Sequence, residues 1–248
     1  MIYYYFKYLK IRIARIVFRT IYPFFPIKSN RITFCSFEGL QYTCNPKYIF
    51  ESMYHRFGRE YDYVWILARQ ADIPEEFRQS VKIVKPKSAK YIYYLITSGV
   101  IINNIGFEAI FPKRKKQLFI NTWHGGGAYK LISLDLKLYS NTYKRYVSRI
   151  HKLGRDTTDY FLSSSRAFTD NTSRDLVIDR KCFNPTGMPR NDRFFSKDTE
   201  KTQSLKKRIC NVYHINPDTL LVLYAPTFRG HGKMMRNIAN DVCCSRVE

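Results

Sequence analysis

His124 is the residue of this sequence best suited to chemistry, because it stands between an apolar stretch and three glycines, Gly125, Gly126 and Gly127. The preceding residues 117–121 predict a short buried strand. Glycines allow a positive φ and a close approach of ligands to backbone N–H groups, and ligand sites of open α/β folds lie where strands end. A histidine there can exchange a proton near neutral pH. The structural alternative is a tight turn whose histidine is solvated or bonded to a backbone carbonyl.

The net charge predicts an anionic partner. The 248 residues include 42 Lys and Arg against 20 Asp and Glu, a formal charge of +22. Phosphate-rich substrates, nucleic acid and acidic membrane surfaces all suit such a charge, and charge alone does not choose among them. With 45% hydrophobic residues, the chain can bury a core and fits one large domain, or one domain with part of another.

Neither a metal centre nor a nucleic-acid motif is expected. The six cysteines show no metal-ligand spacing and no secretory signal accompanies them, so reduced cytoplasmic thiols are the expected state. They are residues 35, 44, 182, 210, 243 and 244. No helix-turn-helix, zinc-finger or RNP-type block is visible, so the charge supports only nonspecific, salt-sensitive binding of nucleic acid.

Residues 1–28 predict an amphipathic leader helix that binds an anionic membrane surface. Arg12, Arg15 and Arg19 cluster on one side of the helix, opposite an apolar side. The apolar side comprises Phe6, Leu9, Ile13, Ile16 and Val17. Charges interrupt the segment too often for a span of roughly 20 apolar residues, whereas a cationic, aromatic helix ending at Pro23 suits a bilayer interface. The alternative is a helix packed on the domain with its arginines solvated.

From residue 30 onward, short apolar runs alternate with helical stretches. This alternation predicts an α/β fold, a Rossmann-like domain with a parallel sheet covered by helices. The predicted strands are 31–37, 63–68, 81–84, 100–103, 117–121, 159–163 and 182–186. The predicted helices are 46–57, 88–97 with Ser88 as its cap, and a polar region reaching about 155, and the serines 163–165 are expected to cap another helix.

An eighth apolar run, 220–225, follows a charged stretch and predicts the first strand of a second α/β domain. The residues after it show neither helical nor strand periodicity. The predicted organisation is therefore a leader at 1–28, a Rossmann-like acceptor-side domain at 29–215, and the start of a truncated donor-nucleotide domain at 216–248.

Ordered sequence blocks across residues 31 to 229 resemble the CDP-glycerol glycerophosphotransferase family, the teichoic acid polymerases and primases. The blocks are Cys44-Asn45-Pro46-Lys47-Tyr48, Thr122-Trp123-His124-Gly125, Lys130 with Asp135, Gly187-Met188-Pro189-Arg190-Asn191-Asp192, and Leu223-Tyr224-Ala225-Pro226-Thr227-Phe228-Arg229. The resemblance implies the N-terminal half of a GT-B architecture of two Rossmann-like domains. It also implies transfer of glycerol phosphate from CDP-glycerol to a hydroxyl of a lipid-linked polyol or glycan acceptor, with release of CMP, at the cytoplasmic face of the membrane and without a cofactor.

The same resemblance implies roles for individual residues. His124 matches the histidine thought to act as general base on the acceptor hydroxyl, and Asp135 and Asp192 are candidates to orient the base or the acceptor. The candidate substrate- and phosphate-binding residues are Gly125, Gly126, Gly127, Lys130, Arg190, Thr227 and Arg229. Simpler alternatives stay open: Lys130 solvates a loop, Arg190 and Asp192 pair with each other, and Arg229 is a surface residue.

The sequence departs from the family pattern at two places. Gly126-Gly127-Ala128 stands where many members have Thr-Pro, and the residues after Arg229 do not resemble the family's donor domain. Two interpretations follow from the whole sequence. One is a glycerophosphotransferase-type protein whose sequence is cut short, and the other is a non-enzymatic basic protein that binds anionic membrane or nucleic acid.

Overall fold

The structure is a computed structural model that describes residues 2–69, 72–125, 140–154, 157–195 and 199–222. The chain divides into two compact units, Met1–Phe195 and Ser196–Glu248, and each is considered by itself. The first unit contains the sheet and the described parts of the predicted site. The predicted domain bounds, at 28/29 and 215/216, stay predictions.

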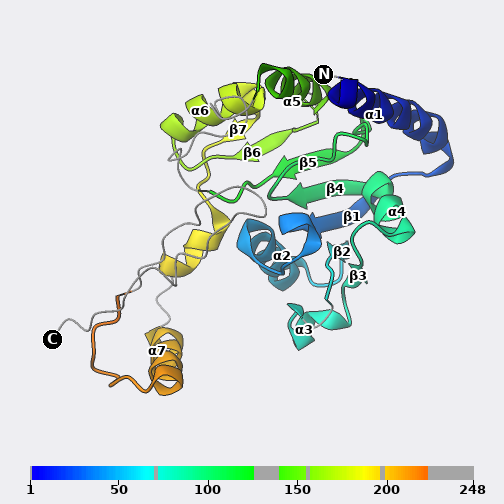
Figure 1. Cartoon of the computed structure of the whole chain (residues 1–248). Helices are drawn as coiled ribbons and strands as arrows, with labels where there is room; N and C mark the ends of the chain where they lie inside the picture. The colour runs from blue at the N-terminus through cyan, green and yellow to red at the C-terminus, as the bar shows by residue number, and fades with distance from the viewer. Residues whose placement is uncertain (1, 70–71, 126–139, 155–156, 196–198, 223–248) are drawn as a thin grey trace. The chain divides into compact units, whose positions relative to one another are not determined.

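A parallel sheet forms the centre of the first unit (Figure 1). Its strand order among the described residues is β3-β2-β1-β4-β5-β6-β7, and every pair of neighbours runs parallel. The strands are β1 (Lys28–Cys35), β2 (Asp62–Ile66), β3 (Lys82–Val84), β4 (Ser98–Asn103), β5 (Leu118–Asn121), β6 (Tyr160–Leu162) and β7 (Phe183–Asn184). The order reverses direction between β1 and β4, and in such sheets this switch point is where ligands bind.

Helices connect the strands, as the alternating pattern predicts. They are α1 (Ile2–Ile21), α2 (Cys44–Phe57), α3 (Glu75–Arg78), α4 (Ala89–Thr97), α5 (Asn141–Gly154), α6 (Arg166–Leu176) and, in the second unit, α7 (Thr199–Tyr213). Short 3₁₀ turns are η1 (Tyr22–Phe24), η2 (Phe37–Gly39), η5 (Arg180–Cys182) and η6 (Pro189–Phe195). Ser88 caps α4 by accepting from the Tyr91 N–H, and Ser165 caps α6 by accepting from the Phe168 N–H, so both predicted caps are confirmed.

The predicted α/β fold is confirmed, and the seven strands from 31–37 to 182–186 appear in order with shifted ends. The eighth predicted strand is wrong for its first half, because residues 220–222 form no strand, and residues 223–225 lie outside the described residues. An apolar run becomes a strand only where a neighbouring strand pairs with its backbone groups.

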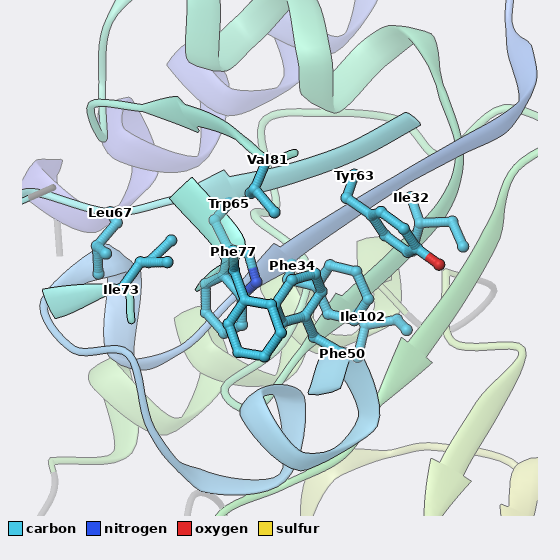
Figure 2. Close-up of a cluster of buried hydrophobic side chains, with 10 residues drawn as sticks. All are labelled: Ile32, Phe34, Phe50, Tyr63, Trp65, Leu67, Ile73, Phe77, Val81 and Ile102. Atoms are coloured by element: carbon cyan, nitrogen blue, oxygen red, sulfur yellow. The ribbon is translucent and has the colours of Figure 1, made fainter. Parts of the chain in front are cut away.

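Aromatic side chains fill the core on the face of the sheet that α2 and α3 cover (Figure 2). Phe34 stacks on Trp65 at 5.6 Å between ring centroids, and Phe50 of α2 meets Phe34 edge-on at 5.4 Å. These three rings are completely buried. Burying large aromatic side chains is worth about 1.5–3 kcal/mol each, so this cluster fixes α2 on the strands that lead to the site.

Strand register aligns three residues at the carboxyl edge of the sheet. Cys35, the last residue of β1, pairs with Asn103 of β4, and Asn103 pairs with Asn121 of β5. The three residues end their strands side by side although they are far apart in the sequence. This row lies beside the switch point between β1 and β4.

The leader helix α1 packs on the domain but leaves its apolar side exposed. It lies against α5 (Figure 1), and Phe18 contacts the buried Phe111 at 4.6 Å between ring centroids. The exposed apolar side chains of α1 include Phe6, Leu9, Ile13, Ile16 and Val17, which are 40–58% exposed. No helix within the described part of the chain is both long and apolar enough to cross a bilayer.

Arg15 corrects the predicted arrangement of the leader. Its side chain is buried and donates from Nη1 to the backbone oxygens of Ala109, at 2.8 Å, and Phe111, at 3.4 Å. Burial lowers the pKa of this guanidinium. Helical spacing places Arg15 beside Arg12 and Arg19, but its long side chain reaches carbonyl groups that only the tertiary fold supplies.

Candidate active site

His124 follows β5 directly, at the carboxyl edge of the sheet. Its Nδ1 lies 2.8 Å from the backbone oxygen of Asn104, the residue after β4. The imidazole stacks on the Trp123 indole at 4.5 Å between centroids and lies 5.7 Å from the Phe37 ring. Residues after three adjacent strands β1, β4 and β5 therefore orient the ring.

The bond to Asn104 determines which imidazole nitrogen can act as a base. A carbonyl oxygen only accepts, so Nδ1 donates its proton to this oxygen. In the neutral ring Nε2 then carries the lone pair, as in other sites where a second hydrogen bond fixes the tautomer. The sequence left open a histidine bonded to a backbone carbonyl as an alternative to a chemical role, and this bond is present. The same bond leaves Nε2 as the ring nitrogen that can accept a proton.

The turn at His124 uses an unexpected residue for its left-handed conformation. Trp123 has φ of 51°, whereas Gly125, which the glycine run suggested for a positive φ, does not adopt one. Trp123 is stabilised in this conformation because its N–H donates to the Asn121 side chain at 2.9 Å. Non-glycine residues in this region cost of order 1–3 kcal/mol and gather at functional sites.

The Asn45 side chain links three segments of the site by hydrogen bonds. Its side chain is fully buried in the first turn of α2. The Nδ2 atom donates to the backbone oxygens of Thr122, at 2.9 Å, and Trp123, at 3.1 Å, and Oδ1 accepts from the Arg190 N–H at 3.2 Å. One amide group thus joins α2, the end of β5 and η6.

The Arg190 guanidinium contacts the His124 segment directly. Its Nη1 donates to the His124 backbone oxygen at 2.9 Å and lies 3.4 Å from the Cys44 Sγ. The side chain is half-buried. The structure therefore places a permanent cation beside the histidine, and it brings together two predicted site residues separated by 66 positions.

A cationic pocket of about 350 Å³ opens beside these residues. Arg190 and Arg193 line it together with Tyr48, whose hydroxyl accepts from Arg193 Nη1 at 3.3 Å. Thr43 and Cys44, where α2 begins, also line it. Two guanidinium groups and the positive end of a 14-residue helix favour a phosphate group in this pocket.

Left-handed backbone is concentrated around the same edge. Phe37, Glu38, Cys44 and Trp123 all have φ between 46° and 62°. Phe37 and Glu38 belong to the connection from β1 to α2, Cys44 is the first residue of α2, and Trp123 follows β5. This concentration supports a functional site at the carboxyl edge of β1 and β5.

The other predicted site residues are placed as follows. Asp192 is exposed in η6, two residues after Arg190. Six predicted residues lie outside the described part of the chain: Gly126, Gly127, Lys130, Asp135, Thr227 and Arg229. Among the described residues, no group of three or more His, Cys, Asp or Glu side chains is placed to hold a metal ion.

Sequence reasoning missed three residues of this site, namely Asn45, Tyr48 and Arg193. Asn45 and Tyr48 belong to the Cys44–Tyr48 block, so their position in that block was the available signal. Arg193 lies just after the Gly187–Asp192 block and carried no signal of its own. Its role follows only from η6, which places it beside Tyr48.

Comparison with protein families identifies this arrangement. Residues 16–243 match the family described as CDP-Glycerol:Poly(glycerophosphate) glycerophosphotransferase. The chain belongs to this family. The predicted resemblance is therefore confirmed, and membership favours the transferase interpretation over a basic protein without enzymatic ancestry.

The curated relatives of this chain carry the names of enzymes that synthesise teichoic acids. The chain is 29% identical over 244 residues to the "Teichoic acid poly(glycerol phosphate) polymerase" of Bacillus spizizenii, covering 94% of this chain and 60% of the relative. It is 27% identical over 232 residues to the "Teichoic acid glycerol-phosphate transferase" of Staphylococcus aureus, covering 89% of this chain and 57% of the relative. The chain thus spans about 60% of the length of these relatives.

Solved structures share the fold. The wall teichoic acid polymerase TagF superposes with a TM-score of 0.67 at 24% identity, over 92% of this chain and 57% of TagF. A TagF variant soaked with CDPG gives the same TM-score and coverage. The chain therefore has the same α/β fold as the matched part of TagF, with the Rossmann-like sheet that the sequence predicted.

Proposed function

We propose that this protein transfers glycerol phosphate from CDP-glycerol to a hydroxyl of a lipid-linked cell-wall or surface-polymer acceptor, with His124 as general base. The observation that carries the proposal is the His124 ring itself. Nδ1 is bonded to Asn104, Nε2 is left as the basic nitrogen, and Arg190 lies against the same segment. Family membership supports the choice of CDP-glycerol as donor.

The proposed step is an attack of the acceptor oxygen on the phosphorus that carries glycerol. A new oxygen–phosphorus bond forms, the bond to the CMP oxygen breaks, and CMP leaves with that electron pair. His124 Nε2 takes the hydroxyl proton, a contribution worth roughly 10²–10⁴-fold in rate. Asp135 and Asp192 stay candidates to orient the base or the acceptor.

The cationic pocket suits the phosphate that is being transferred. Phosphoryl transfer depends mainly on positioning and on cations that neutralise developing charge. Arg190, which bonds to the His124 backbone, and Arg193, which lines the same pocket as Arg190, supply two such cations. Lys130, Thr227, Arg229 and the glycines 125–127 stay predicted contributors to phosphate binding.

We also propose that α1 attaches the protein peripherally to the cytoplasmic face of the membrane. Its exposed apolar residues form one helical side, and Lys7, Lys10, Arg12 and Arg19 are exposed around it. The helix contains no acidic residue. Apolar insertion with flanking cations is the mode by which interfacial helices bind anionic lipid.

CMP release in a chimera tests the transferase proposal. Residues 1–229 would be joined to the part of the Bacillus spizizenii polymerase that follows the matched segment, and CMP release from CDP-glycerol measured with a lipid-linked acceptor. We expect release by the chimera, and a loss of about 10²–10⁴-fold in the His124→Ala variant. His55→Ala, at an exposed histidine of α2 outside both pockets, serves as the matched control. Undiminished release by His124→Ala would remove His124 from the mechanism.

A further inference from the structure

A second cavity, of about 520 Å³, borders the loop that holds His124. Asn104 binds the His124 ring through its carbonyl, and its neighbours Asn103 and Ile105 both line this cavity. The aligned row at the strand ends, Cys35, Asn103 and Asn121, also lines it. The cavity therefore shares a wall with the candidate active site.

The lining of this cavity is rich in groups that bind hydroxyls. Glu38 and Glu108 contribute carboxylates, and Asn103 and Asn121 contribute amides, which can both donate and accept. Tyr91 and Phe107 add aromatic surface. Paired polar groups beside aromatic rings suit a ligand with many hydroxyls and apolar C–H faces.

Charge separates this cavity from the cationic pocket. Among its described lining residues Lys87 is the sole lysine or arginine, against the two carboxylates of Glu38 and Glu108. Burial lowers the pKa of His151, another lining residue, and so disfavours a positive charge on its imidazole. A carboxylate-bearing wall disfavours a phosphate and accepts a neutral hydroxyl ligand.

The backbone of the rim is held in unusual conformations. Glu38 has φ of 56°, Lys87 has φ of 60° and Gly106 has φ of 148°. The Gly106 segment is fixed by Asn103, whose side chain donates to the Gly106 oxygen at 3.0 Å and accepts from the Ile105 N–H at 3.1 Å. Three connections are thus preorganised around one opening, as at other ligand sites.

We propose that this cavity binds a neutral, hydroxyl-rich sugar or polyol unit of the acceptor. The chemistry of the ligand follows from the lining alone, whereas its assignment to the acceptor rests on the proposed function. Such a cavity favours an acceptor that presents a neutral sugar or polyol over one that presents a chain of phosphodiesters.

The position of α1 supports an acceptor role. Ala109, which lines the cavity, accepts the hydrogen bond from Arg15 of α1. The loop of the cavity is therefore fastened to the helix proposed to lie on the membrane. A lipid-linked acceptor brings its sugar to the protein from that surface.

Ligand binding to the 248-residue chain tests this inference. Methyl β-cellobioside and ribitol would be titrated as neutral probes and followed by saturation-transfer difference NMR, with glycerol 3-phosphate as the anionic probe. We expect the chain to bind a neutral probe. Glu108→Gln should weaken that binding by about fivefold, because a neutral hydrogen bond replaces a charge-assisted one. Tyr91→Phe, which keeps the ring, is expected to weaken it as well.

Control variants separate the two pockets. Glu60→Gln, exposed and distant in sequence from the lining, should bind the neutral probes normally, and Arg193→Gln should weaken only glycerol 3-phosphate. The inference is overturned if neither neutral probe binds, if Glu108→Gln binds them as tightly as the unmodified chain, or if glycerol 3-phosphate displaces them. CMP release by the chimera without neutral-probe binding would reject this inference and leave the proposed function intact.

Discussion

The cationic pocket and the carboxylate-lined cavity border the same histidine segment and carry opposite charges. The first is lined by Arg190 and Arg193, and the second by Glu38 and Glu108. A chain with a formal charge of +22 has no general shortage of cations, so the local carboxylates are a specific feature of the cavity. This difference is the basis of our proposal that one pocket at this edge of the sheet binds a phosphate and the other a neutral hydroxyl ligand.

The two regions also differ in how the fold builds them. The cationic pocket is made by segments that follow β1 and β7, joined through the buried Asn45 amide. The cavity is made by the aligned strand ends Cys35, Asn103 and Asn121. Burial, followed by the charges of Glu108 and Glu38, raises the pKa of the Cys35 thiol to about 12. The lining of the cavity therefore includes a neutral thiol as well as the two carboxylates.

Breaking the Asn45 link is expected to have the largest effect on the framework that both regions share. Asn45→Ala removes the donor to the buried Thr122 carbonyl and the acceptor of the part-buried Arg190 N–H, whereas the Trp123 carbonyl still accepts from Thr122 Oγ1 at 3.3 Å. The loss costs about 3 kcal/mol. Urea unfolding should report this loss of free energy, and the chimera should release CMP more slowly. Asn211→Ala, at an exposed asparagine of α7 that lines neither pocket, is the matched control, and an equal small loss in both variants would contradict the account of Asn45.

The helix α1, which we propose binds the membrane, is joined to the loop of the cavity by the hydrogen bond from Arg15 to Ala109. Ile13→Asp combined with Ile16→Asp removes two exposed apolar anchors, each worth about 1 kcal/mol or more at an interface. Cosedimentation with phosphatidylglycerol–phosphatidylcholine vesicles should therefore fall at least tenfold, to roughly the binding seen with phosphatidylcholine alone. Leu40→Asp, at a 62% exposed leucine outside α1, should bind normally. If the double variant still binds the vesicles, a surface other than α1 carries the membrane affinity.

The smallest expected effect concerns His151 in the cavity. Its pKa in the folded protein lies below the usual 6.5 because of burial, so the unfolded chain binds this proton more readily. Above about pH 6.5 the residue does not lower the free energy of unfolding. This free energy falls as the pH drops from there through the lower pKa of the folded state. His151→Gln should flatten this part of the stability curve in urea unfolding, whereas His55→Gln, exposed in α2, should not. An NMR titration midpoint of His151 above 6.5 would contradict the prediction.

Most of the fold could be predicted because the signals are local. Apolar runs bounded by polar residues mark the strands, and Ser88 and Ser165 mark two helix starts by side chains that bond three residues ahead. The run 220–222 shows the limit of this reasoning, since it has a strand composition but no strand partner.

The site was predictable only in part. His124 and Arg190 could be found from their sequence blocks, but the bonds that join them depend on Asn45, whose buried amide bridges segments up to 145 positions away. Arg15 was predicted to share one cationic side of the leader helix with Arg12 and Arg19, because helical periodicity does not show the backbone carbonyls that the tertiary structure brings to its side chain. The carboxylate-lined cavity had no sequence signal, because its row of Cys35, Asn103 and Asn121 arises from strand register.

Steady-state kinetics of the chimera test the division between the two pockets most directly. The CMP-release rate would be measured against CDP-glycerol and against acceptor for Arg193→Gln and for Glu108→Gln. We predict that Arg193→Gln lowers kcat/KM for CDP-glycerol about fivefold with the acceptor KM unchanged, and that Glu108→Gln raises the acceptor KM about fivefold with CDP-glycerol unaffected. If both variants impair the same substrate, the two regions do not serve separate substrates and the central claim is wrong.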